Sequence, residues 1–357
     1  MARDPLSADR ARAHGAAPRA AGPRRHGTTY AALDLGTNNC RLLVARPSSD
    51  GFRVVDAFSR IVRLGEGLGA SNRLRDEAIR RTIEALKVCR HKMEARGVAR
   101  ARLIATEACR AAVNGAEFIA RVREETDLDL EIVDRETEAH LAVAGCASLA
   151  DPRAEGVVLF DIGGGSSELV WLDRERSGRR RLPDRVRAWT SLPVGVVTLA
   201  ERHGGVDVSR DGFQAMVDEV YGLLEGFLAD LGGSRPCDRF HLLGTSGTVT
   251  TIAGVHLALP RYDRRQVDGL WMRAEQVDGV LENLLAMTYR DRAANPCIGQ
   301  ERADLVLAGC AILEAIRRAF PADRLRIADR GLREGILMQL MAEDGVWNGN
   351  GRGGSRG

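Results

Sequence analysis

Aromatic residues, lysine and long hydrophobic runs are scarce in this sequence of 357 residues. Phenylalanine, tryptophan and tyrosine make up 4% of it, although 44% of the residues are hydrophobic. No stretch approaches the roughly 18 apolar residues of a membrane span, so we expect no membrane-spanning segment and no membrane partner. The hydrophobic content and a net charge of +3 also exclude a wholly disordered chain. The length favours two domains.

The cysteines show neither metal-binding nor redox spacing. No two are arranged as CxxC, which argues against a zinc or thiol redox site. An odd number without a framework indicates reduced thiols, so we expect a cytoplasmic location. The seven are Cys40, Cys89, Cys109, Cys146, Cys237, Cys297 and Cys310.

Arginine supplies almost all of the positive charge. The chain has 52 basic and 49 acidic residues, and Lys87 and Lys92 are its only lysines. A net charge of +3 is too small to indicate nucleic-acid binding, so no such partner is expected. Two explanations of the arginine excess stay open: a GC-rich genome, or recognition of phosphate, whose oxygens match the guanidinium fork.

Both ends of the chain are expected to be disordered. Residues 1–27 are basic, show no hydrophobic period and lack the apolar core of a secretion signal. An organellar transit peptide is an alternative, although three prolines would break its amphipathic helix. The Gly-rich residues 344–357 form the second tail.

One unit occurs twice: a buried strand ending in Asp-x-Gly, a short loop and a second strand. Its aspartates are Asp34 and Asp161. Two copies of a β-rich unit with helices between them predict an α/β fold, with two similar domains at 28–142 and 143–343 that flank a cleft. The strands expected from the two copies are 30–35, 40–46, 157–162 and 168–172.

Further strands and helices are expected from hydrophobic periodicity and turn signals. The strands are 52–58, 102–106, 130–133, 187–192, 239–243 and 324–328. The helices are 76–96, 116–125, 136–150, 211–231, one ending near 259, 274–289, 301–319 and 331–341.

The loops of the two repeated units have the composition of phosphate-binding loops. Glycines let backbone N–H groups approach an anion, and the neighbouring hydroxyl and amide groups add donors. A nearby carboxylate suits hydrated Mg²⁺, which keeps waters and takes substrate phosphates as ligands. A simple hairpin explains one such turn, but two of them predict a clamp on a phosphate chain. The loop residues are Gly36, Thr37, Asn38, Gly163, Gly164, Gly165 and Ser166.

A third glycine loop lies at 242–251 between an expected strand and a helix. Ser246 and Gly247 would offer donors to a phosphate at the helix start. A helix cap by Thr245 or Ser246 explains the same residues. There is no GxxxxGK[ST] motif, so the chain is not a P-loop enzyme.

Seven stretches between residues 28 and about 341 carry a recognisable pattern: AALDLGTNNCRLLVA, VRLGEGL, TEACRAAVNG, ETEAHLAVAG, LFDIGGGSSELVW, GTSGTVTTIAG and LREGIL. Together they resemble the exopolyphosphatase and guanosine pentaphosphate phosphohydrolase (Ppx/GppA) family of the actin-like ATPase and sugar-kinase superfamily.

The resemblance implies two RNase-H-like domains, with the last helix returning to the first. It implies Mg²⁺-dependent removal of terminal phosphate from polyphosphate, or of the 5′ γ-phosphate from guanosine pentaphosphate. K⁺ is a candidate activator. Longer relatives are dimers, so a homodimer is one possibility and the oligomeric state stays open. The resemblance also implies that these relatives carry a further C-terminal domain, which we do not expect in this chain.

The family's functional residues transfer by position. Its catalytic glutamate matches Glu138, its metal-binding aspartate matches Asp161, and Asp34 matches the aspartate of the first loop. Its phosphate-binding arginine matches Arg110. The sequence departs from the family pattern just before Glu138, where Asp134-Arg135 replaces Ser-Gly and Thr137 replaces a glutamate. His140 and His241 have no suitably spaced partner, so we expect no metal there.

Three functions remain in competition. The favoured one is a phosphohydrolase in which Glu138 activates water as a general base while Asp34 and Asp161 hold Mg²⁺. The rivals are a sugar or acetate kinase of the same fold and a non-catalytic binder of guanosine tetraphosphate. The sequence does not decide between polyphosphate and guanosine pentaphosphate. Nor does it decide whether the arginine-rich run at 174–187 is a plain loop or a guide for polyanions.

Overall fold

The computed structural model describes residues 27–49, 51–173, 185–232 and 239–347. Most of the two expected tails and of the arginine-rich run at 174–187 lies outside these residues. In the part described, no helix is both long and apolar enough to cross a membrane.

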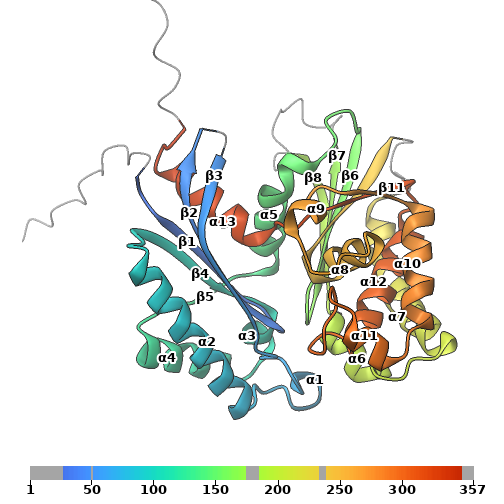
Figure 1. Ribbon diagram of the computed structural model, residues 1–357, viewed down its shortest axis with the longest axis horizontal. Coiled ribbons are helices and arrows are strands. Elements are labelled where there is room, and N and C mark those ends of the chain that lie inside the picture. Colours follow the sequence, from blue (N-terminus) through green and yellow to red (C-terminus); the bar gives the residue numbers. More distant parts are fainter. Residues whose placement is uncertain (1–26, 50, 174–184, 233–238, 348–357) are drawn as a thin grey trace, which may run out of the picture.

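The fold is mixed α/β and contains two sheets, as predicted (Figure 1). The first has the order β3-β2-β1-β4-β5. Strands β1, β2 and β3 form an antiparallel meander, whereas β4 runs parallel to β1 and β5 parallel to β4. The strands are β1 (Tyr30–Leu35), β2 (Asn39–Ser48), β3 (Gly51–Ile61), β4 (Arg100–Ala105) and β5 (Glu131–Ile132).

The second sheet repeats this arrangement and adds one edge strand, in the order β10-β11-β9-β6-β7-β8. Its meander is β6, β7 and β8, and β9 and β11 extend it in parallel. The repeat seen in the sequence is therefore a repeat of structure. The strands are β6 (Gly156–Ile162), β7 (Ser167–Asp173), β8 (Val186–Leu192), β9 (Phe240–Thr245), β10 (Trp271–Arg273) and β11 (Arg324–Ile327).

Two helices, α5 (Arg135–Cys146) and α13 (Leu332–Glu343), lie between the two sheets (Figure 1). Apolar residues of α5 such as Val143 pack with β6 and β7, whereas Leu141 packs with β1, β2 and α13. The α13 helix contacts α5, β1, β2 and β4. The last long helix therefore returns to the first sheet.

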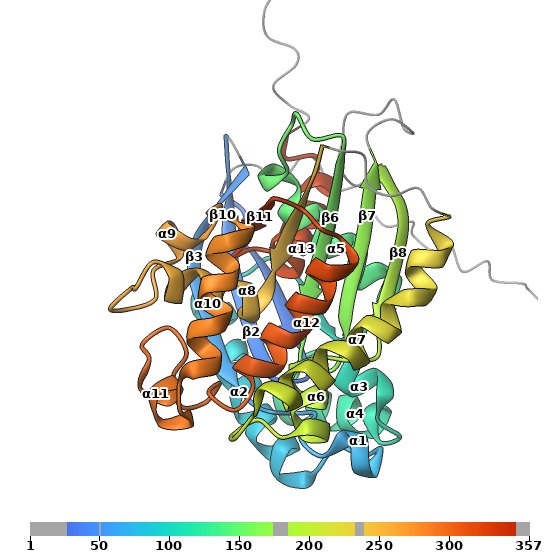
Figure 2. The same ribbon diagram turned by 90° about the vertical axis from the view of Figure 1, so that its right-hand side faces the viewer.

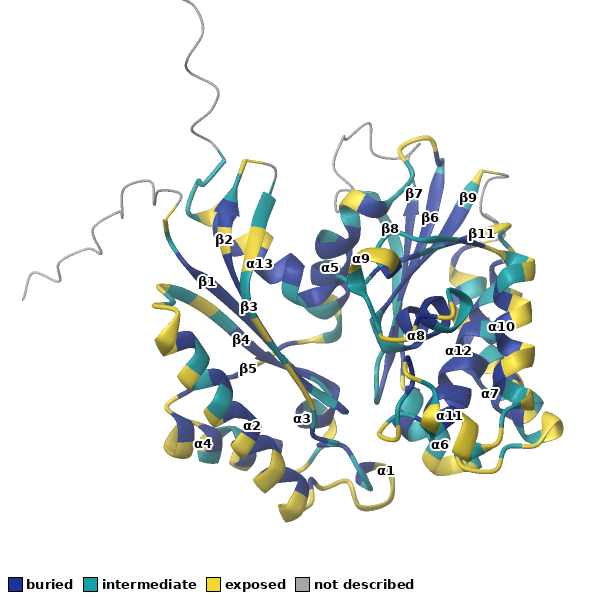
Figure 3. Cartoon of the chain, in the orientation of Figure 1, coloured by how far each residue is buried: buried dark blue, intermediate teal, exposed yellow. Residues whose placement is uncertain are grey.

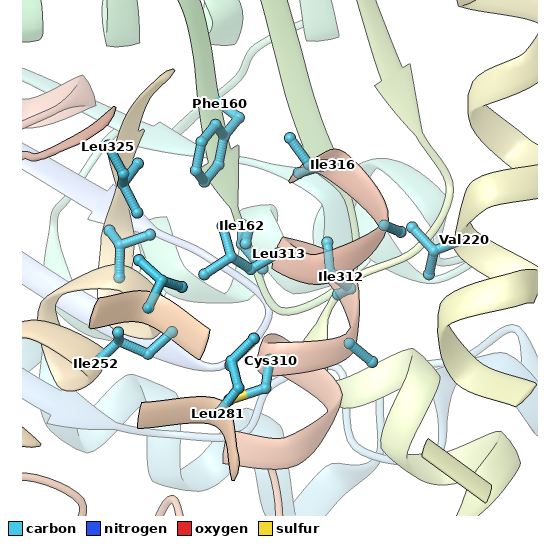
Figure 4. Packing of buried hydrophobic residues seen from close by; sticks show 14 of the residues in the cluster. Phe160, Ile162, Val220, Ile252, Leu281, Cys310, Ile312, Leu313, Ile316 and Leu325 are labelled. Atoms are coloured by element: carbon cyan, nitrogen blue, oxygen red, sulfur yellow. The ribbon is translucent and has the colours of Figure 1, made fainter. Parts of the chain in front are cut away.

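Other helices cover the outer faces of the sheets. Beside the first sheet, α2 (Asp76–Ala95) and α4 (Gly115–Thr126) bury one face and expose the other (Figure 3). Behind the second sheet, α12 (Val306–Ala319) is largely buried; its Ile312, Leu313 and Ile316 lie in one buried cluster with Phe160 and Val220 (Figure 4). Figure 2 shows the helices of this layer: α7 (Arg210–Asp230), α8 (Ser246–His256) and α10 (Ala274–Ala286) together with α12.

Several expected boundaries were wrong. The helix expected at 301–319 begins only at Val306, because residues before it form turns. The helix expected at 274–289 ends at Ala286, where Thr288 caps a new helix. The sequence analysis missed six short elements: α1 (Leu68–Ser71), α3 (Glu107–Ala111), α6 (Val196–His203), α9 (Arg264–Val267), α11 (Tyr289–Ala294) and β10.

Candidate functional site

The two repeated hairpins place their aspartates at equivalent positions. Asp34 lies opposite Arg41 in the β1–β2 pair, and Asp161 lies opposite Glu168 in the β6–β7 pair. Directly opposed residues of an antiparallel pair project from the same face of the sheet. All four side chains line one cavity of about 110 Å³ between the two sheets. The predicted aspartates are therefore brought together, each with a cross-strand neighbour.

The first two glycine loops touch each other at this cavity. A Cβ added to Gly164 would lie 2.9 Å from Thr37 Cβ, and one added to Gly165 would lie 2.7 Å from Thr37 Oγ1. Only glycine fits so close an approach. Every residue predicted for these two loops lines the cavity: Gly36, Thr37, Asn38, Gly163, Gly164, Gly165 and Ser166.

The third glycine loop reaches the same cavity through Ser246 and Gly247. The Ser246 hydroxyl donates to Asp161 Oδ1 at 2.5 Å, and the Thr245 hydroxyl donates to the Arg330 carbonyl. Neither side chain caps α8. The helix-cap explanation of this loop is therefore wrong, and Ser246 instead orients a site carboxylate.

Glu138 enters the cavity from the first turn of α5. The helix begins at Arg135 because the Asp134 side chain accepts a hydrogen bond from the Thr137 N–H. The Glu138 side chain is 13% exposed, and Arg110 Nη2 donates to its Oε2 at 3.2 Å. Burial, and then Glu168, raise the pKa of Glu138 well above its usual value, against the opposing effect of Arg110.

Glu168 is a site residue that the sequence analysis missed. It is 2% exposed and accepts a hydrogen bond from the Ser191 hydroxyl at 2.8 Å. Burial and the charge of Asp161 raise the pKa of Glu168 to about 7. The register of the hairpin could have identified Glu168 from the sequence. A loop that closes between Ile162 and Ser167 pairs Asp161 with Glu168.

Arg110 lies behind the carboxylates rather than on the cavity wall. Its guanidinium donates to Glu107, to Glu138 and to the Val133 carbonyl. Arg41 and Arg302 are the arginines that line the cavity, and neither was singled out from the sequence.

A second cavity of about 460 Å³ adjoins the first. The two share Asp34, Asp161, Arg41 and Arg302. The larger cavity is rich in arginine, which makes it suited to an anionic ligand larger than one phosphate group. Its arginines are Arg41, Arg264, Arg302, Arg330 and Arg333.

The carboxylates fit Mg²⁺ better than a metal held wholly by protein. Among the described residues, no group of three or more His, Cys, Asp or Glu side chains could hold a metal ion. Mg²⁺ needs only one or two carboxylates, since waters and phosphates complete its shell. Burial is the main cause of the raised pKa of both Asp34 and Asp161, so a cation there would relieve an unfavourable charge. The buried Asn38 Oδ1, which has no hydrogen-bond partner, is a further free oxygen.

Two equivalent α/β domains, each bringing an aspartate and a glycine loop to one cavity, define the chain as a protein of the actin-like fold. Within that class, the chain belongs to the Ppx/GppA phosphatase family, whose sequence model matches residues 43–344.

Individual relatives agree with this assignment. Exopolyphosphatase 2 of Mycobacterium tuberculosis is 28% identical over 329 residues, which cover 88% of this chain and 98% of the relative. The guanosine-5′-triphosphate,3′-diphosphate pyrophosphatase of Aeromonas salmonicida is 27% identical over 318 residues; the match covers 88% of this chain and 60% of the relative. The crystal structure of the Aquifex aeolicus Ppx/GppA family member superposes with a TM-score of 0.71. Its sequence is 27% identical, and the match covers 89% of this chain and 98% of the Aquifex chain.

Proposed function

We propose that this protein hydrolyses terminal phosphoanhydride bonds in a Mg²⁺-dependent reaction, with inorganic polyphosphate or guanosine pentaphosphate as substrate. The observation that carries the proposal is the convergence of Glu138, Asp34, Asp161 and two touching glycine loops on one cavity. Phosphoanhydride hydrolysis needs charge neutralisation and an oriented water rather than a covalent intermediate.

Each part of the cavity has a place in this reaction. The backbone N–H groups of the glycine loops bind the terminal phosphate. Glu138 takes a proton from the attacking water as a general base. Asp34 and Asp161, with Glu168 beside them, would hold Mg²⁺, which neutralises the charge on the phosphate oxygens when bound.

The larger cavity suits the rest of the substrate. No ion pair with Arg41, Arg302 or Arg333 is present in the described part of the chain, so these guanidinium groups are available to phosphate oxygens. A Cβ added to Gly247 would lie 4.0 Å from both Arg41 Nη2 and Arg302 Nη1. Arginines of both domains therefore approach the point where the third loop enters the site.

The test is a phosphate-release assay. Purified protein is supplied with long-chain polyphosphate or guanosine pentaphosphate, with and without Mg²⁺ and EDTA, and with ATP plus sugars or acetate in parallel. We expect phosphate release from at least one of the first two substrates, abolished by EDTA. Transfer of phosphate from ATP to a sugar or acetate would identify the kinase instead. Binding of guanosine tetraphosphate without turnover of any substrate would identify the regulator.

A further inference from the structure

A third glutamate, Glu107, lines the catalytic cavity but has no part in the reaction proposed above. It begins α3, and its side chain is 12% exposed. A Cβ added to Gly165 would lie 3.2 Å from Glu107 Cγ, so the residue packs against the second glycine loop. A buried carboxylate here would repel a phosphate substrate unless cations neutralise it.

Two glutamates share one nitrogen of Arg110. Arg110 Nη2 donates to Glu107 Oε2 at 2.6 Å and to Glu138 Oε2 at 3.2 Å. Within the described part of the chain, no other side chain donates a hydrogen bond to Glu138. The orientation of Glu138 therefore depends on how strongly Glu107 draws the Arg110 guanidinium toward itself.

A second arginine holds Glu107 from its other side. Arg135 Nη2 lies 3.0 Å from Glu107 Oε1 and 3.3 Å from Oε2. Two arginines and two glutamates therefore form one connected cluster. Arg135 is the first residue of α5 and lies three positions before Glu138, which places both on the same side of the helix.

Arg135 is poorly placed to serve stability alone. A positive side chain in the first turn of a helix opposes the helix dipole. Its side chain is also 42% exposed, and exposed ion pairs contribute little to folding. We therefore expect the contact to matter mainly because Arg135 offsets the charge of Glu107.

We propose that Arg135 is a positioning residue for hydrolysis. By holding one side of the Glu107 carboxylate, it leaves Arg110 shared between Glu107 and Glu138, and so keeps Glu138 oriented toward the cavity. Without Arg135, Glu107 has a single cation and draws Arg110 to itself, which removes the hydrogen bond that orients Glu138. This inference rests on the proposed function, in which Glu138 is the base.

The experiment compares Arg135→Gln, which removes the charge, with Arg135→Lys, which keeps it. We expect Arg135→Gln to lower kcat about tenfold, as expected for a displaced catalytic group, and to change KM by less than about twofold. Arg135→Lys should retain most of the wild-type kcat. Arg90→Gln is the matched control, because Arg90 of α2 pairs with Glu94 of the same helix and with Asp127, which follows α4, away from both cavities. All variants should melt within about 2 °C of the wild type.

A double-mutant cycle tests whether Arg135 acts through Glu107. In a Glu107→Gln background, Arg135→Gln should lower kcat by less than about twofold further, since the carboxylate charge that Arg135 offsets is already absent. An equal fall in both backgrounds would overturn the inference. So would a raised KM with unchanged kcat, which would mean direct contact with substrate. A loss of kcat that Arg135→Lys shares, together with a lower Tm, would show a structural role.

The activity of the wild type separates failure of the proposed function from failure of this inference. A wild-type protein that hydrolyses neither substrate would overturn both. An active wild type with an unaffected Arg135→Gln variant would overturn the inference alone.

Discussion

Asp34 and Asp161 occupy the same place in two copies of one hairpin, yet their cross-strand partners differ in sign. Arg41 faces Asp34, whereas Glu168 faces Asp161. The first pair partly neutralises itself, while the second concentrates negative charge. Since a hard cation is attracted to the least compensated carboxylates, we expect Asp161 to contribute more than Asp34 to Mg²⁺ binding.

Asp161→Asn tests this asymmetry. The substitution keeps the size of the side chain and an oxygen that can accept from the Ser246 hydroxyl, but it removes the charge. We expect activity to fall steeply and to recover in part at high Mg²⁺. A titration of activity against Mg²⁺ measures the effect, with Asp34→Asn as the comparison. If the Asp161→Asn curve coincides with that of the wild type, the metal belongs to another carboxylate.

Glu138→Gln tests the general base. The amide keeps the shape of the side chain but cannot take a proton from water. We expect hydrolysis to fall by at least roughly 10²-fold while the Tm changes little. Steady-state phosphate release and a thermal melt measure the two quantities. Near-normal turnover in the folded variant would assign the base to another residue.

Glu168 should make stability depend on pH in an unusual direction. The pKa of about 7 in the folded protein exceeds the ordinary 4.5, so the folded state holds the proton more tightly than the unfolded chain. This contribution to stability is complete below about pH 4.5 and is lost as the pH rises toward 7. We expect the Tm in EDTA to decrease between pH 5 and pH 8, and Mg²⁺ to reduce that decrease by replacing the proton.

The measurement is a set of thermal melts in parallel for the wild type and Glu168→Gln. The variant should lose less stability over this range, because it has no proton to release. The explanation would be wrong if both proteins showed the same slope of Tm against pH.

At the level of elements, local signals in the sequence predicted the hairpins well. The strands around Asp34 and Asp161 are short, apolar and separated by glycine turns, so their pairing is determined by neighbouring residues. The predicted start of α12 was wrong because residues 301–305 form turns before the helix. Asp304 in these turns pairs with Arg63 of the other domain. Contacts of this kind leave no periodic pattern.

In the candidate site, too, local sequence patterns predicted some residues, whereas contacts between distant segments determine the others. The loop residues and both aspartates were found because they follow each other in sequence around a turn. Glu107, Arg302 and Arg333 come from three distant segments, and only the folded chain brings them to the cavities. Arg110 was found through the resemblance, but its place behind Glu107 and Glu138 depends on side-chain contacts between α3 and α5.

Two glycines permit the close contact of α5 and α13 between the sheets. A Cβ on Gly335 would lie 2.0 Å from the Leu141 carbonyl oxygen, and one on Gly145 would lie 1.9 Å from the Gly331 carbonyl oxygen. Either side chain would push the two helices apart. This contact holds the later turns of α5, the helix whose first turn carries Glu138.

Gly335→Ala should therefore destabilise the protein. We expect a loss of about 1–3 kcal/mol in the free energy of unfolding, as for overpacking of a tight core. Gly226→Ala in α7 is the control, because nothing lies within 4 Å of its added Cβ, and alanine there should raise stability by about 0.5–1 kcal/mol. Chemical denaturation measures both variants. Equal stabilities of the two variants would show that the helices can separate without cost.

At the scale of the whole molecule, contacts across the cleft hold the two domains in a closed arrangement. Arg63 Nη1 and Nη2 donate to the two oxygens of Asp304 at 2.9 and 3.0 Å. The Gly67 N–H donates to Glu201 at 2.8 Å. Together with the touching glycine loops, these contacts leave a catalytic cavity of about 110 Å³. We therefore expect the domains to separate as a phosphate chain enters and to come together again when it is bound.

Asp304→Asn should shift this equilibrium toward the open arrangement. The side chains of Arg63 and Asp304 are 32% and 24% exposed, so the pair contributes on the order of 1 kcal/mol, which changes the ratio of closed to open molecules roughly fivefold. Without ligand, small-angle scattering should give a larger radius of gyration for Asp304→Asn than for the wild type. A non-hydrolysable phosphate chain should return the variant to the wild-type value, because in the proposed function loops from both domains bind the same phosphate. Asp278→Asn is the control, since Asp278 pairs with Arg317 within one domain. Should Asp304→Asn and Asp278→Asn give the same radius of gyration with and without the phosphate chain, the contact across the cleft does not govern closure.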